Sequence, residues 1–217
     1  ELPGLLHFCN EGANIKGLIN KTILFLDKFL FFCLCNFQLS KFSIVVIVLM
    51  GYMASGKSLI GKLLSKKLNY DYLDLDEYIE QKEGKSISEI FEHKGEIYFR
   101  TIESKLLKEV LSDKKMTVLS LGGGTPCYAN NISEINSSTN TVSFYLKARV
   151  ETILKRLEYD KNKRPLVAHL KNTDELQEFI RKHLFERTFY YNQAKKVISV
   201  DDKTKNEILE EIILQLF

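Results

Sequence analysis

One stretch of eight residues constrains the fold of this chain more than any other feature. It reads Gly51-Tyr-Met-Ala-Ser-Gly-Lys-Ser58 and fits the pattern G-x-x-x-x-G-K-[ST]. The seven residues before it, 44–50, are apolar and rich in β-branched side chains, which predicts a buried parallel strand. After it, apolar residues recur at helical spacing as far as Leu68, which predicts a helix. A glycine-containing turn between a strand and a helix indicates an α/β fold with a phosphate-binding loop.

Two side chains of this loop have predicted roles in binding a nucleoside triphosphate. Lys57 would place a positive charge on the terminal phosphates, and the hydroxyl of Ser58 can ligate Mg²⁺. The alternative is a turn that matches the pattern by chance, but the strand before it and the helix after it argue against that interpretation. We therefore predict that the chain binds a nucleoside triphosphate.

From Ser43 onward, predicted strands and helices alternate. The strands are expected at 44–50, 72–75, 117–121, 142–146 and 197–200, and the helices at 57–68, 77–82, 88–92, 96–111, 150–157, 174–193 and 205–216. Alternation of this kind is typical of a parallel sheet covered by helices on both faces. Residues 43–217 are therefore expected to form one α/β domain, in which the polar stretch 130–140 is a connection.

Composition excludes some partners. The chain has 217 residues with 45% hydrophobic side chains, which is enough for a sizeable core. Its formal net charge is +3 and no lysine- or arginine-rich block stands out, so we expect no nucleic-acid partner. The four cysteines form no paired CxxC elements, and only Cys127 lies in the predicted domain, so reduced cytosolic thiols are expected.

Residues 1–42 are expected to lie outside this domain. Their apolar run, 29–35, is much shorter than the roughly 20 residues that span a membrane. A secretory signal would need a basic start and a small-residue cleavage site, and neither is visible. The first methionine is Met50, so we expect the segment to be a mis-assigned start, a cloned fragment, or a disordered or helical addition to the domain, and we expect no membrane partner.

The residues that follow the strands are the candidates for a site, because ligands gather at the carboxyl ends of parallel strands. Asp74 and Asp76 follow the second strand and can lie on the same side, one near a metal and one near an acceptor hydroxyl. Capping of the next helix explains Asp76 equally well. The glycines 122–124 follow the third strand and either admit a bound molecule close to the backbone or form a flexible turn.

Three arginines are candidates for holding an anion. Arg100 lies in the second turn of a predicted helix, and Arg187 lies near the end of a later one. Each has a simpler explanation, which is an ion pair with a nearby acidic residue on a solvated helix face, Glu96 or Glu103 in the case of Arg100. Arg164 belongs to the charged segment 161–166, which is either a surface loop or a lid that brings the arginine to a transferring phosphate.

Together these motifs resemble the shikimate kinase family from residue 44 to the C-terminus. In order they read GYMASGKS, LDLD, GEIYFRTIE, SLGGGTP, KRPL and ERTFYYNQA. The resemblance implies an α/β, three-layer P-loop kinase fold with a five-stranded parallel sheet, helices on both faces and a mobile lid. It also implies transfer of the γ-phosphoryl group of ATP to the 3-hydroxyl of shikimate, a step towards chorismate and aromatic amino acids.

The resemblance further implies a role for each candidate residue. Ser58 would ligate one Mg²⁺ ion per subunit, and Asp74 would support that ion through water. Asp76 would be the catalytic base, assisted by Lys57 and Arg164. The ATP-binding residues would be Ala54, Ser55, Gly56, Lys57, Ser58, Leu59 and Arg164. The shikimate-binding residues would be Asp76, Arg100, Gly123 and Arg187.

The sequence departs from the family pattern at three places. Leu59 stands where threonine is usual, Ala54 replaces a frequent glycine, and Thr188-Phe189 follow Arg187 where proline and then tyrosine are usual. The last departure leaves open whether Tyr190 or Tyr191 is the equivalent tyrosine.

Two other functions are compatible with a phosphate loop. The chain could be another small-molecule P-loop kinase, acting on gluconate or on a nucleoside monophosphate, although nucleoside monophosphate kinases usually read GKGT and lack the other motifs. It could also be a non-catalytic or membrane-tethered nucleotide-binding regulator, but every candidate catalytic position is retained. We expect a cytoplasmic monomeric enzyme whose small-molecule partners are ATP and shikimate.

Overall fold

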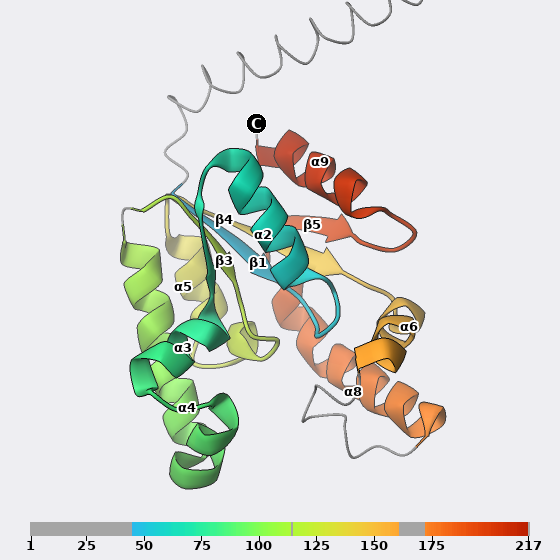
Figure 1. Cartoon of the computed structure of the whole chain (residues 1–217), viewed down its shortest axis with the longest axis horizontal. Coiled ribbons are helices and arrows are strands. Elements are labelled where there is room, and N and C mark those ends of the chain that lie inside the picture. The colour runs from blue at the N-terminus through green and yellow to red at the C-terminus, as the bar shows by residue number, and fades with distance from the viewer. Residues whose placement is uncertain (1–44, 114, 161–171, 217) are drawn as a thin grey trace, which may run out of the picture. The chain divides into compact units, whose positions relative to one another are not determined.

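The computed structural model describes residues 45–113, 115–160 and 172–216. Within these ranges, five strands form one parallel sheet in the order β2-β3-β1-β4-β5 (Figure 1). Their bounds are β1 Val46–Met50, β2 Asp71–Asp74, β3 Thr117–Ser120, β4 Thr141–Lys147 and β5 Lys196–Ser199. In the register of the sheet, Val46 pairs with Thr117 of β3 and with Thr141 of β4. The predicted α/β class and the five-stranded parallel sheet are confirmed.

The middle of the sheet is apolar on both faces. All five residues of β1 and all four of β3 are buried, as expected for strands that helices cover on both sides. The edge strand β5 buries only Ile198 of its four residues. The sheet core therefore sits around β1, and the phosphate loop leaves the sheet from this central strand.

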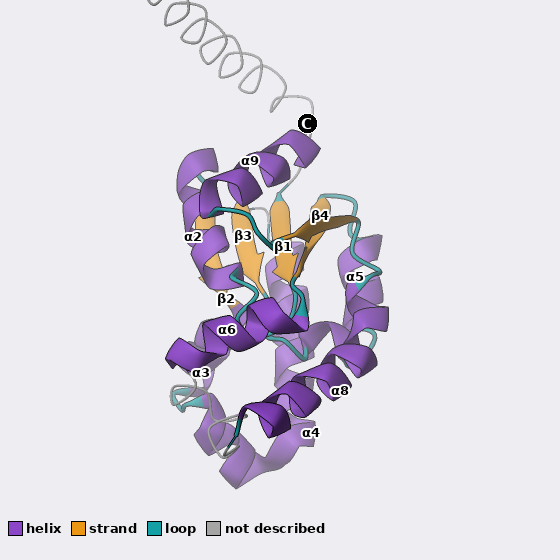
Figure 2. Ribbon diagram, turned by 90° about the vertical axis from the view of Figure 1, so that its right-hand side faces the viewer, coloured by secondary structure: helices purple, strands orange, loops and turns teal. Residues whose placement is uncertain are grey.

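Helices cover both faces of the sheet. Figure 2 shows α2 and α9 on one side of the strands and α5 on the other, with α3, α6 and α8 near the end at which the strands stop. The helix bounds are α2 Lys57–Leu68, α3 Leu75–Glu83, α4 Ile87–Ser112, α5 Asn131–Ser137, α6 Val150–Asp160, α8 Thr173–Tyr191 and α9 Lys205–Leu216. The two helices predicted at 88–92 and 96–111 correspond to α4, which is interrupted at Gly95, where φ is 78°.

The expectation that 130–140 is only a connection was wrong. A short 3-10 helix, η1 Thr125–Cys127, is followed by α5, which buries Ile132 and Ile135 against the domain. The side-chain nitrogen of Asn131 donates a hydrogen bond to the carbonyl oxygen of Thr125, 2.9 Å away. Two apolar residues in seven give too little periodicity to reveal a helix from the sequence, so tertiary packing defines this one.

Two predictions concern residues outside the described ranges. Arg164 and its predicted lid are among them, and so are residues 1–42, so the division of the chain near residue 42 stays a prediction. Among the helices that the structure describes, none is both long and apolar enough to cross a membrane.

Candidate active site

The phosphate loop joins β1 to α2. Its last residue before the helix, Gly56, has a φ of 102°, a conformation that residues with a Cβ rarely adopt. The Nζ of Lys57 donates hydrogen bonds to the carbonyl oxygens of Gly51 and Tyr52, each 2.9 Å away. These bonds hold the ammonium group of Lys57 over the loop, beside the helix N-terminus where an anion is stabilised.

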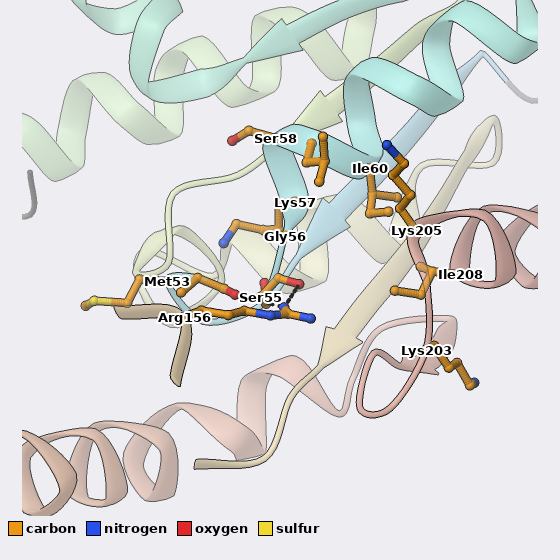
Figure 3. A pocket seen from close by; sticks show the side chains of 12 residues that line it. Met53, Ser55, Gly56, Lys57, Ser58, Ile60, Arg156, Lys203, Lys205 and Ile208 are labelled. Carbon is orange, nitrogen blue, oxygen red and sulfur yellow. Dashed lines mark hydrogen bonds between the residues drawn. The ribbon is translucent and has the colours of Figure 1, made fainter. Parts of the chain in front are cut away.

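A cavity of about 530 Å³ opens beside this loop (Figure 3). Within the described part of the chain, its lining includes four basic side chains and no acidic one, which suits a triphosphate. The lining residues are Met53, Ala54, Ser55, Gly56, Lys57, Ser58, Leu59, Ile60, Arg156, Lys203, Lys205 and Ile208. All six loop residues predicted to bind ATP, 54–59, therefore lie in one cavity, and Leu59 contributes an exposed apolar side chain to it.

Arg156 of α6 is a member of this site that sequence reasoning missed. Its Nη1 donates hydrogen bonds to the carbonyl oxygens of Ala54 and Ser55, each 3.0 Å away (Figure 3). The only signal in the sequence was its place in the helix that follows β4, the neighbour of β1. Because it lies well inside that helix, inspection of the residues directly after each strand passed over it.

Oxygen atoms that could hold a magnesium ion lie where α2 begins and β2 ends. The hydroxyl of Ser58 donates a hydrogen bond to Oδ2 of Asp74 over 3.1 Å. The hydroxyl of Tyr72 donates to the same oxygen over 3.3 Å. The other oxygen, Oδ1, accepts the backbone N–H of Asp76, so Asp74 is the N-cap of α3. The alternative explanation of Asp76 as the helix cap was therefore wrong, because Asp74 has that position.

Asp76 lies in the first turn of α3, against the glycine loop. A Cβ at Gly122 would be only 2.8 Å from its Oδ1, so the glycine leaves room for this carboxylate. Burial raises the pKa of Asp76 to about 6, helped by the negative charges of Asp74 and Glu103 and opposed by Lys57 and Arg100. A carboxyl group with that pKa is a stronger base than an ordinary aspartate and is still ionised at neutral pH.

Arg100 of α4 lies against the same loop. Its Nη2 is 2.7 Å from the position of a Cβ at Gly124. Its Nη1 donates to Oε2 of Glu103 over 2.9 Å, and its Nε donates to Glu96 over 3.5 Å. The ion pairs that offered a simpler explanation of Arg100 are therefore present, yet they also hold its guanidinium group at the glycine loop.

The buried Glu103 is a second residue whose importance sequence reasoning missed. Its side chain is only 1% exposed, and its Oε1 accepts a hydrogen bond from the hydroxyl of Thr125 over 2.6 Å. One carboxylate oxygen of Glu103 thus binds Arg100, and the other binds Thr125, the first residue of η1, directly after the glycine loop. A buried carboxylate with both oxygens engaged fixes the arginine in place more firmly than an exposed surface pair would.

Arg187 of α8 approaches the middle glycine. Its Nη1 is 3.5 Å from the position of a Cβ at Gly123. The carbonyl oxygen of Gly123 accepts a hydrogen bond from the hydroxyl of Tyr191 over 2.6 Å, and Tyr191 is fully buried. Of the two tyrosines after Arg187, Tyr191 and not Tyr190 is thus the one that binds the glycine loop.

Three consecutive glycines therefore face three different charged groups. Gly122 faces Asp76, Gly123 faces Arg187 and Gly124 faces Arg100. The carbonyl oxygen of Gly51, the first residue of the phosphate loop, is 3.8 Å from the Cβ position of Gly123. One carboxylate and two guanidinium groups thus lie against a glycine loop whose middle residue is next to the phosphate loop. This arrangement can place a small anionic acceptor next to a bound triphosphate.

Comparison with known proteins shows which family the chain resembles. A family model described as shikimate kinase matches residues 53–217. A shikimate kinase of Flavobacterium psychrophilum is 52% identical over 171 residues, which cover 79% of this chain and 98% of that protein. A crystal structure of shikimate kinase from Bacteroides thetaiotaomicron has a TM-score of 0.73 at 33% identity and covers 79% of this chain and 98% of its own. Shikimate kinase from Acinetobacter baumannii, solved in complex with shikimate, has a TM-score of 0.70 at 33% identity, with 80% and 93% covered. The chain belongs to the shikimate kinase family.

Proposed function

We propose that the chain transfers the γ-phosphoryl group of ATP to the 3-hydroxyl of shikimate with Asp76 as the base and with Arg100 and Arg187 holding the substrate carboxylate. The observation that carries these assignments is the glycine loop 122–124, whose three residues lie against these three side chains. The family supports the reaction, and the solved relative from Acinetobacter baumannii that contains shikimate supports the acceptor.

The triphosphate would lie in the cavity beside the phosphate loop. Backbone N–H groups at the start of α2 would donate hydrogen bonds to the phosphates, and Lys57 would add a charge at their terminal end. Arg156 keeps the loop in shape through its bonds to the two carbonyl oxygens, and its charge adds to that of the cavity. Arg164 would approach the same phosphates from the lid segment.

Ser58 and Asp74 suit a magnesium ion. Their hydroxyl and carboxylate are hard oxygen donors that already lie 3.1 Å apart, and Mg²⁺ favours such donors in small number with water completing its shell. We assign Ser58 as the direct ligand and Asp74 as a ligand through water, with one ion per subunit. The bound ion would neutralise charge on the β- and γ-phosphates.

Asp76 would take the proton of the acceptor hydroxyl. As that oxygen bonds to the γ-phosphorus, the bond from phosphorus to the β,γ-bridging oxygen breaks, and ADP leaves with the bridging oxygen. Phosphoryl transfer depends mainly on positioning and charge neutralisation, so the base contributes by orienting the hydroxyl as well as by accepting its proton. The raised pKa of Asp76 makes it suited to this second task near neutral pH.

Arg100 and Arg187 would bind the carboxylate of shikimate as planar, two-pronged donors. Gly123, which lies between them in the loop, would offer its backbone to the substrate. Because the hydrogen bond to the buried Glu103 holds Arg100 in place, that arginine is preorganised for the anion.

A coupled ADP-release assay with shikimate, gluconate and AMP in parallel tests this function. We expect turnover with shikimate alone, and turnover with gluconate or AMP but not with shikimate would refute it. Sedimentation and cell fractionation of the same protein test the expected monomer and the expected cytoplasmic location.

A further inference from the structure

Tyr52 has a place in the phosphate loop that the loop pattern leaves free. It is the second residue of the loop, and its side chain is 1% exposed and is not part of the cavity lining. Its carbonyl oxygen accepts a hydrogen bond from Lys57, so its backbone belongs to the nucleotide side of the loop. Its ring instead lies towards α8, on the side of the proposed acceptor site.

The ring of Tyr52 meets His183 of α8. The Tyr52 hydroxyl and Nδ1 of His183 share a hydrogen bond of 3.4 Å, and the two rings meet edge to face with centroids 6.4 Å apart. Phe179 also packs against the imidazole, with 4.1 Å between the ring centroids. Burial, and then the charge of Arg187, lower the pKa of His183, which favours a neutral ring whose nitrogen can accept a hydrogen bond from the tyrosine hydroxyl.

Arg187 lies one helical turn after His183 on the same face of α8. Its guanidinium carbon is 5.8 Å from the centre of the Tyr52 ring, within the range of a cation–π interaction. On its other side, Nη1 lies 3.5 Å from the Cβ position of Gly123. The guanidinium group is therefore placed between an aromatic ring of the phosphate loop and the glycine loop.

We propose that Tyr52 and His183 are positioning residues, which tie α8 to the phosphate loop and hold the Arg187 guanidinium in place for the acceptor carboxylate. This inference rests on the proposed function, in which Arg187 binds that carboxylate. Tyr52 supplies the surface on which the guanidinium lies, and the hydrogen bond to His183 fixes the angle of the ring. Neither residue touches the reacting atoms.

The test compares shikimate and ATP binding by calorimetry in Tyr52→Leu, Tyr52→Phe and His183→Gln. Loss of the ring in Tyr52→Leu should weaken shikimate binding about 5-fold, equivalent to about 1 kcal/mol, and leave ATP binding within about 2-fold. Tyr52→Phe keeps the ring and His183→Gln removes only its partner, so each should weaken shikimate binding by less. Thermal unfolding of all three variants checks the fold, and the latter two carry the test if Tyr52→Leu does not fold.

Tyr52→Leu in an Arg187→Lys background tests whether Tyr52 acts on shikimate binding through Arg187. If Tyr52 acts through Arg187, Tyr52→Leu should have no further effect on shikimate binding there. An equal loss in both backgrounds, or an equal loss for ATP and shikimate, would overturn the inference. If Arg187→Lys weakens shikimate binding but none of the three variants does, only the inference fails. If Arg187→Lys itself leaves shikimate binding intact, the carboxylate assignment in the proposed function fails with it.

Discussion

Replacing Asp76 by asparagine should stabilise the folded protein while nearly abolishing its activity. In the folded state the pKa of Asp76 is raised from its ordinary value of 3.8 to about 6, so the folded protein binds this proton more tightly than the unfolded chain does. Stability therefore falls as the pH rises from about 4 to about 6, and above that window the ionised carboxylate destabilises the fold by at most about 3 kcal/mol.

The amide of Asp76→Asn cannot ionise, so the gain in stability should itself depend on pH. Asp76→Asn should raise the free energy of unfolding above that of the native sequence. We expect this gain to be about 2 kcal/mol larger at pH 7.5 than at pH 4.5. That corresponds to roughly 4–8 °C in the unfolding midpoint of a domain of this size. The native enzyme should lose kcat/KM as the pH falls below about 6, and kcat of the variant should fall by about 10²–10⁴-fold.

Urea unfolding at the two pH values and a steady-state assay measure these quantities. Asp71→Asn, at the exposed start of β2, the strand before α3, is the matched control for the loss of one negative charge. A gain that is the same at both pH values would mean that the ionised carboxylate of Asp76 is not destabilised by its surroundings. A variant with near-native kcat would show that Asp76 is not the base, whatever its effect on stability.

Further predictions concern the arginines, the glycine loop and the N-terminal segment. Arg100→Lys and Arg187→Lys should each weaken shikimate binding by about 1.5–3 kcal/mol in calorimetric titrations and spare ATP, since lysine keeps the charge but loses the two-pronged geometry; equal losses for both ligands would place these residues on the nucleotide instead. Gly122→Ala should lower kcat at least about 10-fold, because its Cβ would displace the Asp76 carboxylate. A 10-fold loss corresponds to an increase of about 1.4 kcal/mol in the activation barrier. The Cβ of Gly123→Ala meets only ordinary contacts, so this variant should lose less activity. The reverse order in a steady-state assay would show that backbone access at Gly123 matters more than the position of the base. Removing residues 1–41 should leave kcat/KM unchanged, and a folded but inactive short form would show that this segment takes part in the mechanism.

The main strands and helices of this fold could be predicted from the sequence because they carry strong local signals. The strand before the phosphate loop is a continuous apolar run, and α2 was predicted with the bounds that the structure shows. The order of the motifs then placed Asp76, Arg100 and Arg187 at one end of the sheet, and the structure brings all three to the glycine loop. Their catalytic and binding roles remain predictions.

What sequence reasoning missed depends on contacts between distant parts of the chain. Arg156 reaches the phosphate loop across about 100 residues, and no local pattern announces that contact. Glu103 looked like a surface partner at helical spacing, but burial against Thr125 turns it into a fixed support. The short helix α5 likewise exists because its two isoleucines pack against the domain.

The glycine loop also limits how this enzyme could be changed to accept a different alcohol. The side chains that would bind the acceptor and the one that would activate it lie against neighbouring residues of a single three-residue segment. A bulkier residue introduced there to reshape the acceptor pocket would displace Asp76, Arg100 or Arg187 before it contacted a new substrate. Selectivity and turnover are thus coupled through this backbone, and a variant with altered acceptor preference would more readily arise from changes in α4 or α8.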